Sequence, residues 1–371
     1  MIDIKPDFKT LKPYSVVKQD VWHYNSKVKI KIDWNEEFLV NKKVEENLID
    51  FIRSSKYALY PDVSSIDLNI ALSKYHNINH NNIMTFNGSD EALDVICRSY
   101  IEKNNIVVFR NPEYGNFITF AETSLAKIEY FYDKDPFVLD ENSFKMHIEK
   151  FKPRLVYISN PNNPTGVLYN FSFLKDMIVS NPNSLFIIDE AYIDFIEKTG
   201  YGESIDEMIH FSTKVNNVIV VRTFSKLYSL AGLRIGYIVT NNEIINDLSL
   251  LRKGKNVSML SQIAAKTAIE SKDFYNEKLE IIREQKKNVI NKCSNLSYVD
   301  NCYDSSANFI CLRINDKVFN RLKTYLYDNG VYIRDRSSIY QLDNIIRVSI
   351  IDDMSLFIHY MDEFEKLIKN I

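Results

Sequence analysis

Short β-rich runs alternate with longer amphipathic stretches between about residues 80 and 240, and this alternation constrains the fold more than any other feature of the sequence. Strands separated by helix-length connections are typical of parallel βαβ units. We therefore predict an α/β fold built on a seven-stranded, mainly parallel sheet. The predicted strands span residues 83–86, 106–109, 127–132, 155–159, 185–188, 218–222 and 235–239, and the clearest connecting helix spans 90–101.

The pattern changes after about residue 241, where long helices and a few shorter strands replace the regular alternation. The longest predicted helix runs from residue 260 to near Cys293, and an amphipathic helix over 354–368 closes the chain. Shorter strands are expected near 308–313, 331–334 and 346–350. This part of the chain is predicted to form a second, α+β domain.

Charge and hydropathy exclude several classes of partner. The 371 residues include 46 Lys and Arg and 49 Asp and Glu, and a net charge of −3 provides no field suited to nucleic acid or an anionic membrane. The first residues lack the order of a signal peptide, and no stretch approaches the ~20 apolar residues that span a bilayer. We expect a cytoplasmic protein that binds neither nucleic acid nor a membrane.

The scarce cysteines and glycines are informative. Four cysteines without a Cys-x-x-Cys pair favour buried thiols over a disulfide framework or a zinc site. Only 9 residues are glycine, so the position of each glycine is informative. Five of them lie in short polar blocks, which indicates bends that a ligand requires. These are Gly88, Gly115, Gly166, Gly232 and Gly236.

Polar segments follow five of the predicted strands, and ligands of parallel α/β sheets gather at the carboxyl ends of the strands. The segments offer a loop suited to phosphate, an aromatic ring, an amide, a carboxylate with a phenol, and a hydroxyl with a lysine. They are Asn87-Gly88-Ser89-Asp90-Glu91, Pro112-Glu113-Tyr114-Gly115, residues 160–166, Asp189-Glu190-Ala191-Tyr192 and Thr223-Phe224-Ser225-Lys226.

That set of groups fits pyridoxal 5'-phosphate better than other cofactors. This cofactor needs a lysine for its aldehyde, a carboxylate for its ring nitrogen and donors for its phenolate oxygen. It also needs an aromatic ring to stack on and a phosphate cradle. The sequence therefore predicts pyridoxal phosphate at the carboxyl edge of the sheet.

The same segments resemble the fold-type-I aminotransferases, and within them the histidinol-phosphate aminotransferase group. The resemblance is carried by residues 223–237, by Asn-Asn-Pro-Thr-Gly at 162–166 and by Asp-Glu-Ala-Tyr at 189–192, and it runs through nearly the whole chain. It implies the fold of type I pyridoxal-phosphate-dependent transferases. The expected large domain spans residues 34–245, and residues 1–33 and 246–371 form the small domain.

The resemblance implies catalytic and cofactor-binding roles that suit the chemistry of each side chain. Lys226 would hold the cofactor covalently and move a proton between the substrate Cα and the cofactor. Asp189 would pair with the pyridine nitrogen. Asn163 and Tyr192 would hydrogen-bond the phenolate oxygen, and Tyr114 would lie against the face of the ring.

The resemblance also implies a phosphate site and a dimer. Ser225, Arg234 and the backbone donors of Ser89 and Asp90 at a helix N-terminus would bind the cofactor phosphate. Tyr60, which precedes a proline, matches a family tyrosine that reaches into the phosphate site of the partner subunit. A homodimer is therefore expected.

Three further positions match family residues that hold the anionic groups of the substrate: Tyr14, Arg334 and Arg347. Arg347 resembles the arginine that binds the α-carboxylate, and Arg334 resembles one that helps to bind a substrate phosphate. A planar guanidinium can grip either anion with two hydrogen bonds. Asn308 also matches a family motif, and its role is left open.

The chain departs from the family pattern at three places. Residues 35–40 read Asn-Glu-Glu-Phe-Leu-Val where the family has Asn-Glu-Asn-Pro followed by an aromatic residue and glycine. Gly-Lys-Asn at 254–256 replaces a Pro-aromatic-Asn pattern, and Ile351-Asp352 stands where Gly-Thr is common. The loss of Pro and Gly at 35–40 is expected to change the loop over the active-site mouth. The three departures leave the cofactor site untouched but weaken any assignment of an imidazole substrate.

The expected reaction exchanges an amino group between L-glutamate and the keto form of a small phosphorylated amino alcohol. The candidates are histidinol phosphate and a three-carbon analogue such as a serinol phosphate. The alternative is a decarboxylase of phosphoserine or phosphothreonine, because some relatives with this motif set break the bond from Cα to the carboxylate. A cofactor-binding protein without catalysis is disfavoured, since Lys226 is present.

Two other readings of the residues are rejected. The chain contains no Gly-x-Gly-x-x-Gly, which disfavours a dinucleotide-binding dehydrogenase. His76 and His80 have helical metal-ligand spacing, yet the asparagines around them indicate a turn, so no metal is expected.

Overall fold

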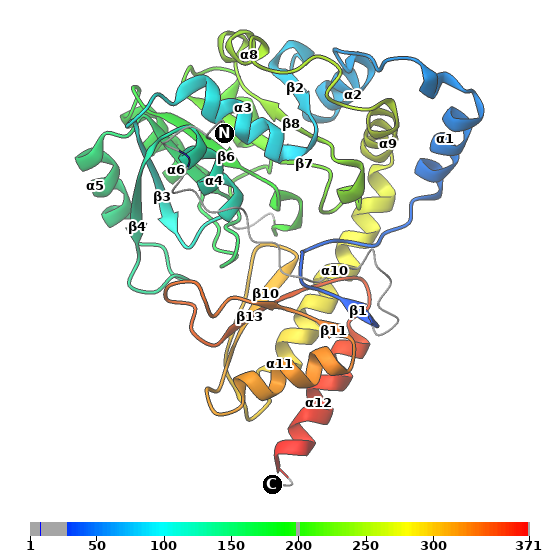
Figure 1. Cartoon of the computed structure of the whole chain (residues 1–371), viewed down its shortest axis with the longest axis vertical. Coiled ribbons are helices and arrows are strands. Elements are labelled where there is room, and N and C mark those ends of the chain that lie inside the picture. The colour runs from blue at the N-terminus through cyan, green and yellow to red at the C-terminus, as the bar shows by residue number, and fades with distance from the viewer. Residues whose placement is uncertain (1–7, 9–27, 198–200, 370–371) are drawn as a thin grey trace, which may run out of the picture.

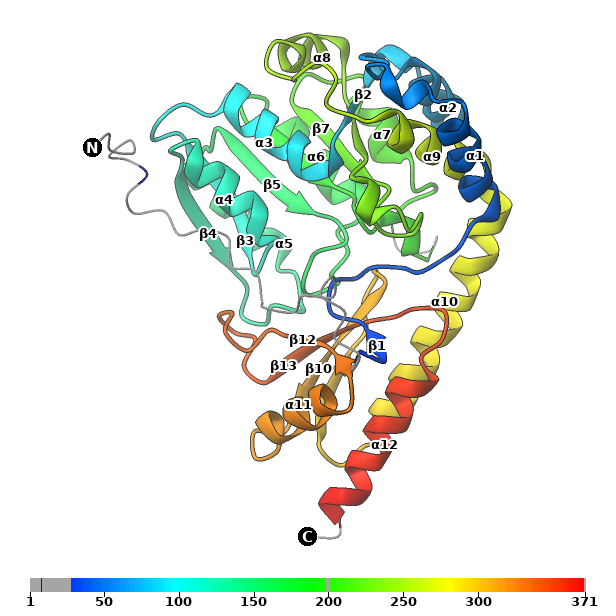
Figure 2. The same ribbon diagram turned by 45° about the vertical axis from the view of Figure 1, so that its right-hand side comes forward.

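Two sheets organise the molecule, one above the other in Figures 1 and 2. The computed structural model describes residues 8, 28–197 and 201–369. The larger sheet has seven strands in the order β2-β8-β7-β6-β5-β3-β4. Its strands are β2 Ile83–Phe86, β3 Ile106–Asn111, β4 Lys127–Tyr132, β5 Leu155–Ser159, β6 Leu185–Asp189, β7 Val218–Thr223 and β8 Gly236–Val239.

The predicted seven-stranded, mainly parallel sheet is confirmed. Neighbours from β7 to β4 run parallel, whereas β8 runs antiparallel to both β7 and β2. The link between β7 and β8 contains only a short 3-10 helix, η6 Ala231–Leu233. A parallel return needs a crossover that is usually a full helix, so this short link brings β8 back in the opposite direction. Lys226 lies in the link.

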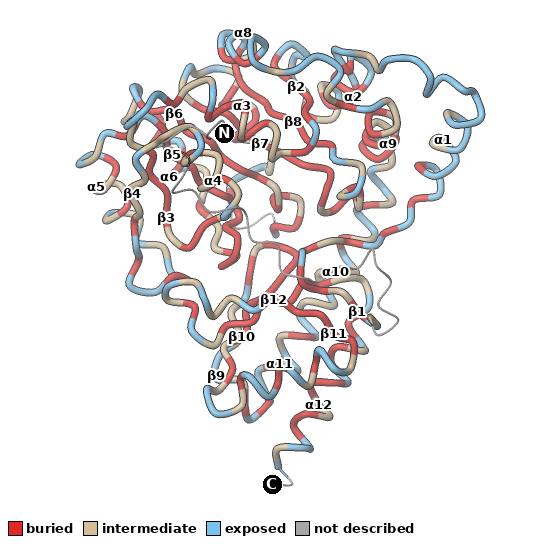
Figure 3. Tube along the Cα trace, in the orientation of Figure 1, coloured by how far each residue is buried: buried red, intermediate tan, exposed pale blue. Residues whose placement is uncertain are grey.

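Alternate residues of the central strands pack into two separate apolar layers. Val156, Phe186 and Val220 belong to one layer, and Tyr157 and Ile187 belong to the other. Because side chains of a strand alternate between faces, both faces of the sheet are buried. The residues of the central strands are accordingly coloured as buried in Figure 3.

Helices cover both faces. The layer that contains Tyr157 includes residues of α3, α4 and α8, and the opposite layer includes residues of α5, α6 and α7. These helices are α3 Gly88–Tyr100, α4 Gly115–Thr123, α5 Glu141–Phe151, α6 Phe171–Ser180, α7 Glu207–Ser212 and α8 Asn242–Ser249.

The smaller sheet is antiparallel, with the strand order β12-β13-β10-β9. Its strands are β9 Val299–Tyr303, β10 Phe309–Ile314, β12 Arg334–Asp335 and β13 Ile345–Ser349. A separate parallel pair joins β1 Ile30–Lys31 to β11 Val331–Tyr332, so the segment that precedes the large sheet is anchored beside the small one.

The remaining helices frame the two sheets. They are α1 Lys42–Arg53, α2 Ile66–His76, α9 Met259–Glu270, α10 Lys272–Cys293, α11 Phe319–Asp328 and α12 Ser355–Lys369. Short 3-10 helices are η3 Lys56–Ala58, η4 His80–Asn82 and η5 Ile193–Phe195. In Figure 2, α10 runs along one side from the large sheet to the small one.

The prediction of one long helix from residue 260 to Cys293 is wrong, because two helices meet at Ser271. The backbone of Ser271 leaves the helical region, with φ −100° and ψ 39°. Its hydroxyl donates to the carbonyl oxygen of Thr267 at 2.7 Å, and its amide donates to that of Ala268. Serine competes in this way for helix carbonyls, which explains the break.

The membrane and domain expectations have different outcomes. No helix in the part of the chain that the structure describes has the length and apolar character to cross a bilayer. The division into residues 34–245 and residues 1–33 with 246–371 stays a prediction.

A substitution at Gly166 tests the close contact between the large sheet and the segment before β10. The φ of Gly166 is +76°, and an added Cβ would lie 2.8 Å from the Cα of Ser305, which precedes β10. We expect Gly166→Ala to lower the free energy of unfolding by about 1–3 kcal/mol, measured by urea denaturation. Gly115→Ala is the control, because a Cβ there meets nothing within 4 Å. Equal effects of the two substitutions would contradict this description.

Candidate active site

The segments predicted to carry function lie at one edge of the large sheet. β2 and β7 both run antiparallel to β8, so β2 shares the direction of the parallel strands. The carboxyl ends of β2, β3, β5, β6 and β7 therefore meet at the same edge, where parallel α/β sheets bind ligands. Asp189 is the last residue of β6, and Lys226 follows β7 by three residues.

Asp189 is a buried carboxylate, 3% exposed, that is held in one orientation. The Tyr157 hydroxyl donates to Oδ2 at 2.7 Å, and the Ala191 amide donates to Oδ1 at 3.1 Å. Burial raises the pKa of Asp189 to about 6. No basic side chain is hydrogen-bonded to this carboxylate among the described residues, so its negative charge is available to a ligand.

The Tyr192 hydroxyl accepts hydrogen bonds from two side-chain amides. Asn35 Nδ2 donates to it at 3.0 Å, and Asn163 Nδ2 donates at 3.3 Å. The Lys226 Nζ lies 5.4 Å from the centroid of the Tyr192 ring and donates to the carbonyl oxygen of Trp34 at 3.1 Å. The predicted residues Asn163, Tyr192 and Lys226 are therefore brought together.

A second group gathers around the start of α3. Gly88 has φ +80°, and a Cβ there would lie 2.9 Å from the Arg234 Cζ. A Cβ at Gly236 would lie 2.7 Å from the Ser89 backbone nitrogen. The two glycines thus let the Arg234 side chain and β8 approach a helix N-terminus, where backbone N–H groups favour anions. Asp90 Oδ2 lies 3.4 Å from Arg234 Nη2.

Tyr114 and Ser225 border the same group. The Tyr114 hydroxyl donates to Asp90 Oδ1 at 2.9 Å, and burial followed by the charge of Asp90 raises the pKa of Tyr114 well above its ordinary value. Ser225 is buried, and its backbone amide and hydroxyl both contact the hydroxyl of Thr223, at 3.1 and 3.0 Å. The β7–β8 link therefore has a fixed conformation before Lys226.

Arg347 enters the site from β13 of the small sheet. It is 4% exposed, and it donates from Nη1 to Asn163 Oδ1 at 2.6 Å and from Nη2 to the Asp33 carbonyl oxygen at 2.7 Å. Burial lowers the pKa of this guanidinium. Arg334 lies directly opposite Arg347 in the β12–β13 ladder. Both predicted substrate arginines thus belong to neighbouring strands.

One predicted site residue, Tyr60, is not brought into this cluster. Tyr60 is 79% exposed, and the Lys255 Nζ lies 3.8 Å from the centroid of its ring. Tyr14 lies outside the described residues. His76, weighed above as a metal ligand, instead lies 2.8 Å from the Tyr237 hydroxyl through Nε2 and 3.1 Å from Asp206 through Nδ1.

Four residues at the site were missed as functional candidates. Asn35 and Tyr157 position Tyr192 and Asp189. Glu37 and Arg336 contact Asn308 and Asn163, and each also carries a buried polar atom without a hydrogen-bond partner among the described residues. A signal existed for Arg336, because it follows Arg334 by two residues and the two side chains of a strand at that spacing share a face. Asn35 and Glu37 belong to the altered segment 35–40, but the sequence of that segment does not indicate which distant residues they contact.

Glu37 links the altered segment to Asn308. Its carboxylate is 5% exposed, and Oε1 accepts from Asn308 Nδ2 at 2.8 Å. Asn308 Nδ2 also lies 3.4 Å from the Asn35 carbonyl oxygen. Oε2 has no hydrogen-bond partner among the described residues. Burial raises the pKa of Glu37 to about 8, although the nearby Lys226 opposes the shift.

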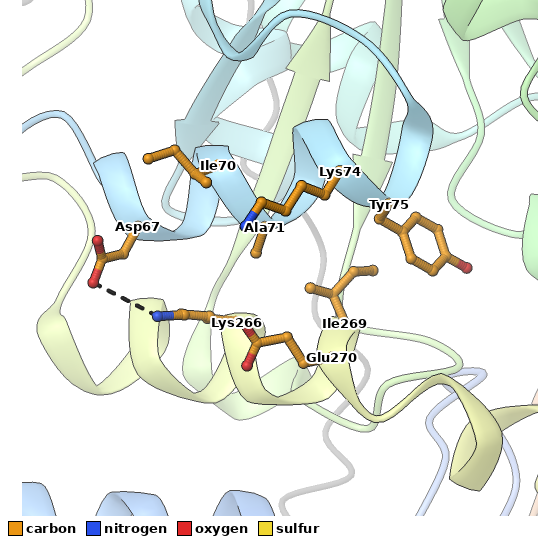
Figure 4. Close-up of a pocket in the computed structure, with 8 residues that line it drawn as sticks. All are labelled: Asp67, Ile70, Ala71, Lys74, Tyr75, Lys266, Ile269 and Glu270. Atoms are coloured by element: carbon orange, nitrogen blue, oxygen red, sulfur yellow. Dashed lines mark ion pairs between the residues drawn. The ribbon is translucent and has the colours of Figure 1, made fainter.

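A surface hollow lies elsewhere, between α2 and α9, as Figure 4 shows. Asp67 and Lys266 form an ion pair across it at 3.7 Å, and Ile70 and Tyr75 also line it. None of the residues at the edge of the large sheet lines this hollow. The converging polar groups therefore identify the sheet edge as the candidate active site.

The buried Glu37 carboxylate predicts a pH dependence of stability. A carboxyl group with a raised folded-state pKa stabilises the fold below its ordinary pKa near 4.5, and this contribution is lost as the pH rises through about 8. Between pH 5 and 8.5 we expect Glu37→Gln to gain on the order of a few kcal/mol in unfolding free energy relative to the unsubstituted protein.

Urea denaturation at several pH values measures this difference. Glu46→Gln is the matched control, because Glu46 is exposed on α1 and its removal should leave the slope unchanged. A Glu37→Gln variant with the same pH slope as the unsubstituted protein would show that Glu37 is not held as a buried acid.

Comparison with known proteins identifies the family. The sequence pattern described as aminotransferase class I and II matches residues 30–356. A histidinol-phosphate aminotransferase of Thermoanaerobacter sp. (strain X514) is 30% identical over 349 residues, which cover 94% of this chain and 93% of the relative. A dihydroxyacetone phosphate transaminase of Campylobacter jejuni is 31% identical over 361 residues, which cover 96% and 95%.

The fold has a close counterpart among solved structures. The histidinol-phosphate aminotransferase from Sinorhizobium meliloti, solved in complex with pyridoxal-5'-phosphate, superposes with a TM-score of 0.87 at 22% identity, covering 98% of both chains. The predictions of a type I fold and of a pyridoxal-phosphate-dependent aminotransferase are confirmed. The chain belongs to the aminotransferase class I and II family.

Proposed function

We propose that this enzyme transfers an amino group between L-glutamate and the keto form of a small phosphorylated amino alcohol. The two relatives described above are named for histidinol phosphate and for dihydroxyacetone phosphate, and both names denote phosphate monoesters. The observation that carries the proposal is the buried Arg347 guanidinium. It meets Asn163 beside Tyr192, and no carboxylate is bonded to it in the described ranges.

The residues at the sheet edge suit pyridoxal phosphate. Asp189 is a fixed, buried carboxylate that has no basic hydrogen-bond partner among the described residues, so a protonated ring nitrogen would supply the missing charge. When bound, the cofactor supplies an electron-accepting ring that allows a proton to leave the substrate Cα. Asn163 and Tyr192 would hold the phenolate oxygen, and Tyr114 would lie against the ring.

The start of α3 is the proposed phosphate cradle. Gly88 and Gly236 leave room for Arg234 beside the Ser89 amide. Ser225 and the Asp90 amide would complete the set of donors. Backbone N–H groups at a helix N-terminus bind anions, and the Arg234 guanidinium would add charged hydrogen bonds to the same phosphate.

Lys226 would anchor the cofactor aldehyde and carry the proton at the substrate Cα. Its Nζ lies over the Tyr192 ring and contacts only a carbonyl oxygen by hydrogen bond in the described chain. Such an amine can turn toward a bound substrate without breaking an ion pair. Arg347 would grip the α-carboxylate, and Arg334, with Tyr14, would hold the substrate phosphate.

A homodimer in the cytoplasm and two domains divided near residue 245 complete the proposal. The exposed Tyr60 supports the dimer, since a ring that is 79% exposed in one chain is free to contact a second copy. In the proposed dimer, Tyr60 reaches the cofactor phosphate of the partner.

Absorbance titration with L-glutamate tests the reaction class. Holoenzyme should convert its bound cofactor to pyridoxamine phosphate and release one equivalent of 2-oxoglutarate. Adding dihydroxyacetone phosphate or the keto form of histidinol phosphate should then restore the original spectrum. No conversion by glutamate, together with release of carbon dioxide from phosphoserine or phosphothreonine, would instead establish the decarboxylase.

Lys226→Ala tests the assignment of the anchoring lysine. We expect the covalently bound cofactor to be lost and turnover to fall by about 10²–10⁴-fold or more, while the thermal unfolding temperature changes little. Lys214→Ala, at an exposed position after α7, is the control and should keep full activity. Multiple turnover by the Lys226 variant at the unsubstituted rate would refute the assignment.

A further inference from the structure

The strand register places a third arginine beside Arg334 and Arg347. Arg334 is opposite Arg347, and the Arg336 amide donates to the Ile345 carbonyl oxygen at 2.9 Å, which continues the same register. Side chains two residues apart on a strand share a face, and so do directly opposed residues. Arg334, Arg336 and Arg347 therefore form one cluster, here called the arginine face.

The arginine face points at the proposed active site. Arg336 Nη2 lies 3.4 Å from Asn163 Oδ1, the same oxygen that Arg347 Nη1 contacts at 2.6 Å. The Nε atoms of Arg336 and Arg347 are both buried and have no hydrogen-bond partner in the portion that the structure describes. Two guanidinium groups thus converge on Asn163 Oδ1, and each keeps an Nε donor that is available to a ligand.

Among the described residues, no carboxylate is hydrogen-bonded or ion-paired to the three arginines, although the charge of Asp33 acts on Arg347. Asp335 lies on the opposite face of β12, and its carboxylate pairs with Lys323 at 2.6 Å. Asp33 pairs with Lys31 at 2.9 Å. Burial, and then the charges of Arg347 and Arg334, lower the pKa of Arg336 to about 9. Like charges on opposed residues destabilise a sheet, and a bound anion would offset that repulsion.

We propose that Arg336 is a third anion-binding residue of the substrate site and makes the site selective for a phosphate monoester over a carboxylate. The inference rests on the proposed function and adds a residue to it. One guanidinium already satisfies a carboxylate through two parallel hydrogen bonds. A phosphate monoester carries nearly two charges and three terminal oxygens, so it can engage a further arginine.

Binding of two unreactive probes to holoenzyme tests this inference by calorimetry. Glycerol 3-phosphate represents the phosphate ester, and glutarate represents glutamate without its amino group. We expect Arg336→Gln to raise the dissociation constant for glycerol 3-phosphate on the order of 10- to 100-fold and to change that for glutarate little. Arg336→Lys should recover part of the lost affinity, because it restores the charge without the planar fork.

Thermal unfolding provides a readout that a merely structural role would not produce. Without ligand, Arg336→Gln should be at least as stable as the unsubstituted holoenzyme, since it removes a like charge. Inorganic phosphate should raise the unfolding temperature of the unsubstituted enzyme more than that of the variant. Arg321→Gln, at an exposed position on α11, is the control and should behave like the unsubstituted enzyme in both assays.

The outcomes separate this inference from the function on which it rests. Equal affinities of Arg336→Gln and unsubstituted enzyme for glycerol 3-phosphate, or equal losses for both probes, would overturn the role of Arg336 alone. Unsubstituted holoenzyme that reacts with glutamate but does not bind glycerol 3-phosphate would overturn the phosphorylated substrate as well. A selective loss for glycerol 3-phosphate supports both.

Discussion

The side-chain amide of Asn163 joins the two sheets, and the geometry of the active site depends on it. A guanidinium can only donate hydrogen bonds, so Arg347 at 2.6 Å requires the oxygen of this amide to face the small sheet. Its nitrogen must then face the Tyr192 hydroxyl at 3.3 Å. Arg347 on β13 therefore orients the Asn163 amide that we propose as a donor to the cofactor. If Arg347 binds the substrate as proposed, this contact would couple substrate binding to cofactor binding.

The site is assembled from charges that are costly to bury. Asp189 has no basic side chain bonded to it, and the arginine face has no carboxylate bonded to it, within the described residues. Unpaired buried charges reduce stability unless a ligand completes them. The proposed ligands would supply the opposite charges, a pyridinium at Asp189 and a phosphate or carboxylate at the arginine face. In the proposed function, binding energy would therefore be concentrated where buried charges lack a partner.

Much of this arrangement could be predicted from the sequence, because strand periodicity and strand-end motifs are local. Asp189 ends a run of apolar residues and Lys226 follows the next strand by three residues, so their positions at the carboxyl edge could be predicted from the alternation. The break at Ser271 was missed, because one serine within an apolar periodicity gives little signal. The contacts of Asn35 with Tyr192 and of Glu37 with Asn308 span 157 and 271 residues, and only tertiary packing brings these partners together.

A crystal structure of the holoenzyme with glycerol 3-phosphate would test most directly whether the two sheets build one site for two phosphates. We expect the cofactor phosphate between the start of α3 and Arg234. We expect the second phosphate against Arg334, Arg336 and Arg347, with the Asn163 oxygen still facing the arginines. A second phosphate bound away from the arginine face, or an Asn163 amide turned the other way, would contradict this expectation.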